Sequence, residues 1–132
     1  MIQIAIVEDE EIYVKQLTEY IRKYQTERGR SIKVTVFGDG EDITENYRGG
    51  FDIILMDIQM RFMDGMTAAE KIRQMDQKVI IMFITNMIQY AVRGYEVDAM
   101  DYVDWVAPLR DSTAIHTCLT MSLRKHGAMA GD

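Results

Sequence analysis

Residues 51–60 read FDIILMDIQM, and this segment is the most informative about how the chain folds. Residues 52–56 are mostly apolar, and a run of this kind is typical of a strand buried on both faces of a sheet. Asp57 follows the run directly. Because aspartate is almost never fully buried without a partner, the carboxylate at the end of this strand needs either a partner or a chemical role.

The composition is that of a small, acidic globular domain. The chain has 132 residues, 48% of them hydrophobic, and a formal net charge of −6. This length predicts one domain over residues 1–126, followed by a frayed tail over 127–132. The negative charge argues against nucleic-acid binding, and no stretch of the sequence is long and apolar enough to span a membrane. A single cysteine, Cys118, favours a reducing, cytoplasmic location.

Five short apolar runs alternate with segments of helical periodicity. The runs predict strands at 2–7, 32–37, 52–56, 79–84 and 99–103. The spacing of apolar residues between them predicts helices at 12–24, 41–47, 66–75, 87–93 and 115–122. This alternation predicts an α/β fold with a doubly wound, five-stranded parallel sheet of flavodoxin-like order 2-1-3-4-5.

Polar side chains follow three of the predicted strands. Glu8 and Asp9 come after the first strand, Asp57 after the third, and Thr85 after the fourth. In doubly wound sheets, ligands bind outside the carboxyl ends of the strands, at the point where the strand order reverses. Because the first and third strands flank that point, we expect Glu8, Asp9 and Asp57 to meet in one crevice.

Three carboxylates in one crevice repel one another, and a bound cation relieves this repulsion. Oxygen ligands favour Mg²⁺, whereas zinc is disfavoured because no His or Cys lies near these acids in the sequence. With a metal in place, Asp57 could attack a phosphoryl group to form an aspartyl phosphate. Thr85 could donate its hydroxyl to a phosphoryl oxygen, although a threonine at this position also serves as a turn or helix cap.

Several stretches, each at a predicted strand end, resemble the receiver domains of bacterial two-component response regulators. They are IAIVEDE (4–10), DIILMDIQM (52–60), MDGM (63–66), FITN (83–86) and AMDYV (99–103). The sequence of residues 83–103 is most similar to the receivers of LytTR-type transcription regulators. The resemblance covers residues 1–103, and it implies a signalling switch with at most self-phosphorylation and autodephosphorylation activity rather than an enzyme.

The resemblance also implies a role for each matching residue. Asp57 would accept a phosphoryl group from a sensor histidine kinase. The implied Mg²⁺ ligands are Glu8 acting through water, Asp9, Asp57 and the backbone carbonyl of Gln59. Thr85 and Tyr102 would form the switch pair, a hydroxyl that moves to the phosphoryl group and an aromatic ring that reorients. In this family the receiver usually precedes a DNA-binding output domain, which the 132 residues do not contain. Whether the sequence is a fragment or a stand-alone domain is left open, as is homodimer formation.

Two positions depart from the family pattern. Arg61 stands where the family usually has proline. The family also has a lysine two residues beyond Val103, followed by proline, and Trp105 stands at that position here. A neutral indole cannot replace a phosphate-binding ammonium group. We therefore expect Mg²⁺ binding to survive, while the phosphoryl group is less stable and less well coupled to the fold.

Two other functions compete with the phosphorylated switch. A degenerate receiver could act as a phosphorylation-independent interaction module, which the departures at Arg61 and Trp105 favour. A flavodoxin-like cofactor enzyme is supported by the fold class alone, which is weak support for a function. The acidic loop after the first strand also lacks the glycines of a phosphate-binding loop.

Overall fold

The structure is a computed structural model, and it describes residues 1–85, 105–108, 112–113, 115–117 and 119–121. Its strands are β1 (Ile2–Val7), β2 (Ile32–Phe37), β3 (Ile53–Asp57), β4 (Ile80–Thr85) and β5 (Trp105–Pro108). Its helices are α1 (Glu11–Arg28), α2 (Gly40–Asn46) and α3 (Gly65–Met75). The residues described between 112 and 121 are also helical.

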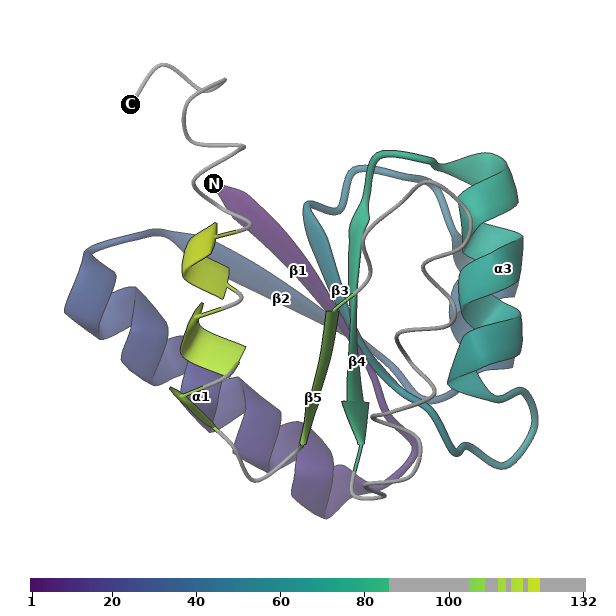
Figure 1. Cartoon of the computed structure of the whole chain (residues 1–132), viewed down its shortest axis with the longest axis horizontal. Helices are drawn as coiled ribbons and strands as arrows, with labels where there is room; N and C mark the ends of the chain where they lie inside the picture. The colour runs from purple at the N-terminus through teal and green to yellow at the C-terminus, as the bar shows by residue number, and fades with distance from the viewer. Residues whose placement is uncertain (86–104, 109–111, 114, 118, 122–132) are drawn as a thin grey trace.

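The strands form one parallel sheet in the order β2-β1-β3-β4-β5 (Figure 1). The order reverses between β1 and β3, which are neighbours. The predicted α/β fold with a parallel sheet is thus confirmed. Because all strands run the same way, their carboxyl ends meet at one edge of the sheet, and this edge carries the site described below.

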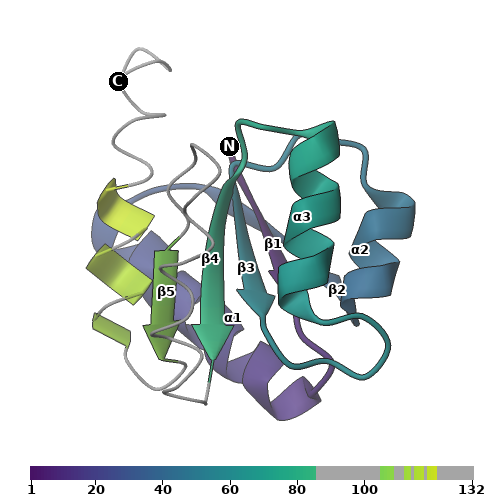
Figure 2. The same cartoon turned by 45° about the vertical axis from the view of Figure 1, so that its right-hand side comes forward.

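Helices cover both faces of the sheet (Figures 1 and 2). Alternate residues of the central strands point to opposite faces. One core cluster contains Ile6 and Leu55 and packs against α1 and the last helical segment, through residues such as Leu17 and Leu119. The other core cluster, on the side of α2 and α3, includes Val7, Ile43, Met56, Ile72 and Phe83. Burial on both faces explains why the central strands are apolar without alternation.

Two element boundaries follow from local chemistry. Helix α1 ends where Gly29 adopts the left-handed conformation, with φ 63°, and its N–H donates to the carbonyl of Gln25. Glycine reaches this conformation without steric cost and commonly ends helices in this way. Helix α3 begins after Asp64, whose carboxylate accepts a hydrogen bond from the N–H of Thr67 at 2.8 Å.

Part of the prediction concerns residues outside the described ranges. The predicted helix at 87–93, the predicted strand at 99–103 with Tyr102, and the tail at 127–132 all fall there. The strand that pairs with β4 consists of later residues, Trp105–Pro108.

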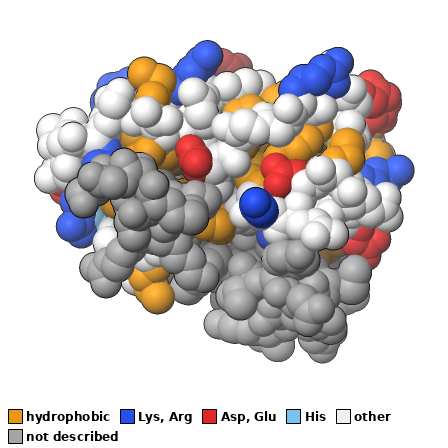
Figure 3. All heavy atoms as spheres, turned by 90° about the horizontal axis from the view of Figure 1, so that it is seen from above, with side chains coloured by type: hydrophobic (Ala, Val, Ile, Leu, Met, Phe, Trp, Pro, Cys, Tyr) orange, Lys and Arg blue, Asp and Glu red, His pale blue; other side chains and the backbone are white. Residues whose placement is uncertain are grey.

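The surface seen from the top of Figure 1 mixes both signs of charge. Figure 3 shows acidic and basic side chains scattered among apolar ones on this face, and its coloured residues form no continuous basic stripe of the kind that nucleic-acid binding requires. Within the described part of the chain, none of the helices combines the length and the apolar composition needed to cross a membrane.

Candidate functional site

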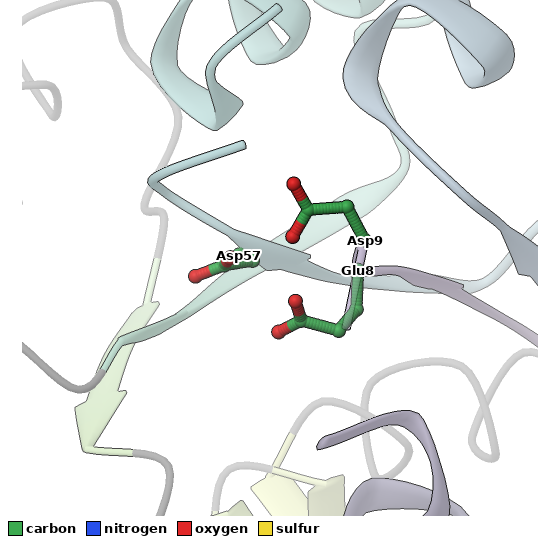
Figure 4. Close-up of side chains that lie close together, drawn as sticks. All are labelled: Glu8, Asp9 and Asp57. Atoms are coloured by element: carbon green, nitrogen blue, oxygen red, sulfur yellow. The ribbon is translucent and has the colours of Figure 1, made fainter. Parts of the chain in front are cut away.

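Three carboxylates meet at the carboxyl edge of the sheet, as predicted. Glu8 and Asp9 follow β1, and Asp57 is the last residue of the neighbouring strand β3. Each offers an oxygen, and these oxygens all lie within 4.8 Å of one another. Figure 4 shows the three side chains reaching into the same space from the two strand ends. We call Glu8, Asp9 and Asp57 the acid cluster.

Burial differs within the acid cluster. Glu8 is buried, Asp57 is half-buried and Asp9 is exposed. Glu8 also accepts a hydrogen bond from the backbone N–H of Glu10 at 3.0 Å, which holds its side chain at the start of α1. The acid cluster is therefore shielded from solvent at Glu8 and accessible at Asp9.

Desolvation dominates the electrostatics of the acid cluster. Burial, reinforced by the charge of Asp57, raises the pKa of Glu8 from 4.5 to about 8. Burial also raises the pKa of Asp57 from 3.8 to about 7; the N–H of Ile58 and a hydrogen bond with Glu8 oppose this, and the charge of Asp9 adds to it. Such shifts mark groups whose charge lacks compensation, and a hard cation would supply it. The donor set, three carboxylates with oxygens within 4.8 Å of one another, fits the oxygen ligands that Mg²⁺ prefers.

The loop that follows Asp57, residues 58–64, is tied to the ends of β1 and β2. We call it the site loop. The N–H of Arg61 donates to Asp9 Oδ2 at 3.0 Å. The N–H groups of Phe62 and Met63 donate to the two carboxylate oxygens of Asp39, at 3.1 and 2.9 Å. Three consecutive backbone donors of the loop are thus held by two carboxylates.

The sequence pattern did not indicate that Asp39 holds the site loop. Its side chain is buried, and it also accepts from the N–H of Glu41 at 3.0 Å as the N-cap of α2. The sequence signal was GDG at 38–40, which indicates a turn and a helix start but says nothing of a contact to residues 62 and 63.

Gly65 closes the site loop against the backbone of Asp57. Its N–H donates to the carbonyl of Ile58 at 2.7 Å. A Cβ at position 65 would lie 2.0 Å from the carbonyl oxygen of Asp57, which is closer than atoms can approach. Glycine is required here because the backbone passes so close to Asp57, and the MDGM stretch of the sequence supplies it.

The remaining predicted residues of the site are placed only in part. Thr85 is buried at the end of β4, one residue beyond Ile84, which pairs with Asp57. Gln59 lies in the site loop and is exposed. The carbonyl of Gln59 as a metal ligand stays a prediction, and Tyr102 lies outside the described residues.

The register of β5 differs from what the sequence predicted for Trp105. Trp105 pairs with Met82 at the amino end of the strand, so it does not lie at the carboxyl edge, where the lysine was expected. Ala107 pairs with Ile84, and Pro108 pairs with Thr85. The difference arises because β5 starts at residue 105, later than the predicted strand. Ala107 directly precedes a proline and is buried.

Comparison with known proteins gives the family. Residues 4–106 match the response regulator receiver domain family. The chain therefore belongs to the response regulator receiver domains. Receiver domains are signalling modules of two-component systems, generally not enzymes, and they bind Mg²⁺ at an acidic pocket, which corresponds here to the acid cluster.

Two curated relatives support the predicted resemblance to LytTR-type regulators. The chain is 32% identical over 102 residues to the transcriptional regulatory protein YpdB of Escherichia coli (strain K12), covering 76% of this chain and 40% of YpdB. It is 30% identical over 105 residues to the sensory transduction protein LytT of Bacillus anthracis, covering 78% of this chain and 41% of LytT. The chain thus spans about two fifths of the length of these relatives.

Solved structures agree with this assignment. The response regulatory domain of protein mrkE from Klebsiella pneumoniae superposes with a TM-score of 0.74 at 25% identity, covering 94% of this chain and 97% of that one. The N-terminal domain of a response regulator/sensory box/GGDEF 3-domain protein from Carboxydothermus hydrogenoformans gives a TM-score of 0.74 at 27% identity, covering 97% and 98% of the two chains.

Proposed function

We propose that this domain accepts a phosphoryl group on Asp57 from a sensor histidine kinase, in a step that depends on Mg²⁺ bound at the acid cluster. The observation that carries the proposal is the meeting of Glu8, Asp9 and Asp57 within 4.8 Å at the carboxyl edge of the sheet. Asp57 is half-buried, so that its carboxylate is partly shielded from water and still accessible to a phosphodonor.

The reaction requires an ionised Asp57. A carboxylate oxygen attacks phosphorus, the bond from phosphorus to the imidazole nitrogen of the donor breaks, and that nitrogen keeps the electron pair. Burial raises the pKa of both Glu8 and Asp57, and a cation bound beside them would lower both values and so favour the ionised form of Asp57. A cation in the cluster would neutralise the charge on the transferring oxygens.

Two further positions complete the proposed site. Thr85 lies one residue beyond Ile84, which is the cross-strand neighbour of Asp57. Its hydroxyl would donate a hydrogen bond to a phosphoryl oxygen. We assign the family's lysine position to Ala107, because Ala107 precedes a proline and lies in the row of Asp57 and Ile84. Alanine offers the phosphoryl group no cation. We therefore expect a shorter phosphoryl lifetime and weaker coupling than a lysine would give.

The proposed output is transcriptional. The relatives YpdB and LytT are named as a transcriptional regulatory and a sensory transduction protein, and both are more than twice the length of the matched segment. We propose that phosphorylation of Asp57 controls a DNA-binding output domain in the cytoplasm, by shifting the domain between two conformations.

Incubation with acetyl phosphate and Mg²⁺, followed by intact-mass measurement, tests the proposal. The wild type should gain the mass of one phosphoryl group, and Asp57→Asn should not. The matched control is Asp52→Asn, just before the amino end of the same strand, which should still be labelled. EDTA should abolish labelling. An unlabelled wild type that binds Mg²⁺ would instead indicate a phosphorylation-independent interaction module.

A further inference from the structure

The site loop contains a hydrogen bond that the family's usual residue could not make. Arg61 donates its backbone N–H to Asp9 Oδ2 at 3.0 Å. Proline, which the family pattern places at this position, has no backbone N–H. The departure at Arg61 therefore adds a donor to the acid cluster, and the donor comes from the backbone rather than from the guanidinium group.

This donor acts on the exposed member of the acid cluster. Glu8 is fixed by burial and by the N–H of Glu10, and Asp57 is half-buried at a strand end. Asp9 is exposed, and an exposed side chain would otherwise sample several rotamers. A carboxylate has about four acceptor sites, so Asp9 can accept from Arg61 and still present oxygen to a cation.

The rest of the site loop gives this donor a fixed origin. Asp39, which is buried, holds the next two N–H groups, those of Phe62 and Met63, at 3.1 and 2.9 Å. Gly65 ties the other end of the loop to Ile58. The Arg61 N–H is thus presented to Asp9 from a loop segment that is anchored on both sides.

We propose that the backbone N–H of Arg61 is a positioning group that orients Asp9 as a ligand for a divalent cation. The proposal rests on the proposed Mg²⁺ site and deepens it. Since the bond joins Asp9 to the site loop, it also links cation binding to the order of residues 61–63. Asp39 holds the next two residues of the site loop in a similar way, although it does not belong to the acid cluster.

The test compares Arg61→Pro with Arg61→Ala by calorimetric titration with MgCl₂. Both variants lose the guanidinium charge, and only Arg61→Pro loses the N–H. A hydrogen bond to a charged group predicts that Arg61→Pro binds Mg²⁺ about three- to tenfold more weakly than Arg61→Ala. Equal affinities of the two variants, with a wild type that binds Mg²⁺, would overturn the proposal.

Amide hydrogen exchange measured by NMR provides a second readout that does not need Arg61→Pro to fold. In Asp9→Ala the Arg61 amide should lose protection, while the Phe62 and Met63 amides keep theirs. In Asp39→Ala the Phe62 and Met63 amides should lose protection, and the Arg61 amide should lose part of its protection because its loop segment loses an anchor. Adding MgCl₂ to the wild type should increase the protection of the Arg61 amide. Unchanged Arg61 exchange in Asp9→Ala would refute the contact, whereas a wild type that fails to bind Mg²⁺ would refute the proposed function instead.

Discussion

Asp57 and Ala107 lie in one row of the sheet, with Ile84 between them: Asp57 pairs with Ile84, and Ile84 pairs with Ala107. Neighbouring strands are about 4.8 Å apart, so about 10 Å separates the two backbones. A lysine side chain, with its flexible four-carbon stem, extends across most of this distance. The row therefore identifies the position from which a cation on β5 would reach the acid cluster.

We predict that Ala107→Lys lowers the pH at which Asp57 takes up its proton by about one unit, because a nearby positive charge favours the ionised carboxylate. The comparison is Trp105→Lys, two residues earlier on the same strand and thus about 7 Å further from the row. This variant should leave the titration unchanged. NMR titration of the Asp57 carboxyl carbon measures both.

The same pair of variants tests the phosphoryl lifetime. Ala107→Lys should lengthen the decay of the labelled protein after removal of acetyl phosphate, and Trp105→Lys should not. If Trp105→Lys acts as strongly as Ala107→Lys, the register of β5 that the structure shows does not hold for the labelled protein.

Cation binding should weaken as the pH falls. Mg²⁺ competes with protons for the carboxylates of Glu8 and Asp57, whose pKa values are raised to about 8 and about 7. Between pH 8 and pH 6 we expect the Mg²⁺ affinity to drop about tenfold or more, with proton release on binding. Titration calorimetry in buffers of different ionisation enthalpy measures both quantities. An affinity that is flat over this range would contradict the raised pKa values.

Asp57→Asn should stabilise the metal-free domain. The pKa of Asp57 in the folded state, about 7, lies above its ordinary value of 3.8. Ionisation of this carboxyl therefore lowers the free energy of unfolding of the domain as the pH rises through the folded pKa. After allowance for its partial exposure, we expect a gain of about 1–2 kcal/mol in the free energy of unfolding at pH 8 and a smaller gain at pH 5. Urea denaturation in EDTA measures this, and Asp52→Asn, outside the acid cluster, is the control. A gain independent of pH would point to a cause other than charge.

Gly65→Ala should damage the site through the backbone. Its added Cβ would lie 2.0 Å from the carbonyl oxygen of Asp57, so the site loop must shift. We expect a loss of more than about 2 kcal/mol in stability, together with weaker Mg²⁺ binding. Gly38→Ala is the matched control, because nothing lies within 4 Å of its Cβ, and it should cost no more than about 0.5 kcal/mol. Similar losses in the two variants would show that helix and turn propensity, rather than the close approach, sets the requirement.

Much of the fold could be predicted because burial on both faces leaves few alternatives. A run such as residues 52–56 forms a central strand of a covered sheet, and β3 is found at Ile53–Asp57. The topology rule then brings the ends of β1 and β3 together. The meeting of Glu8, Asp9 and Asp57 followed from strand ends alone, without any knowledge of side-chain positions.

The edge strand and the loop anchor could not be predicted in the same way. Residues 99–103 and Trp105–Pro108 are both short apolar runs, and only pairing with β4 decides which of them occupies the edge position described here. Asp39 reads locally as a helix cap, whereas its contacts to Phe62 and Met63 join segments more than 20 residues apart. Such contacts depend on the packed structure and leave no periodic signal in the sequence.

The close approach at Gly65 has a consequence for how this domain can diverge. Its φ is not in the left-handed region, so the backbone conformation itself is open to any residue. The restriction comes from the number of residues between Asp57 and Gly65, which determines how tightly the chain returns to the strand end. Loop length and glycine should therefore be inherited together: a homologue with an insertion between these positions is free to carry a larger residue, and one with the same spacing is not.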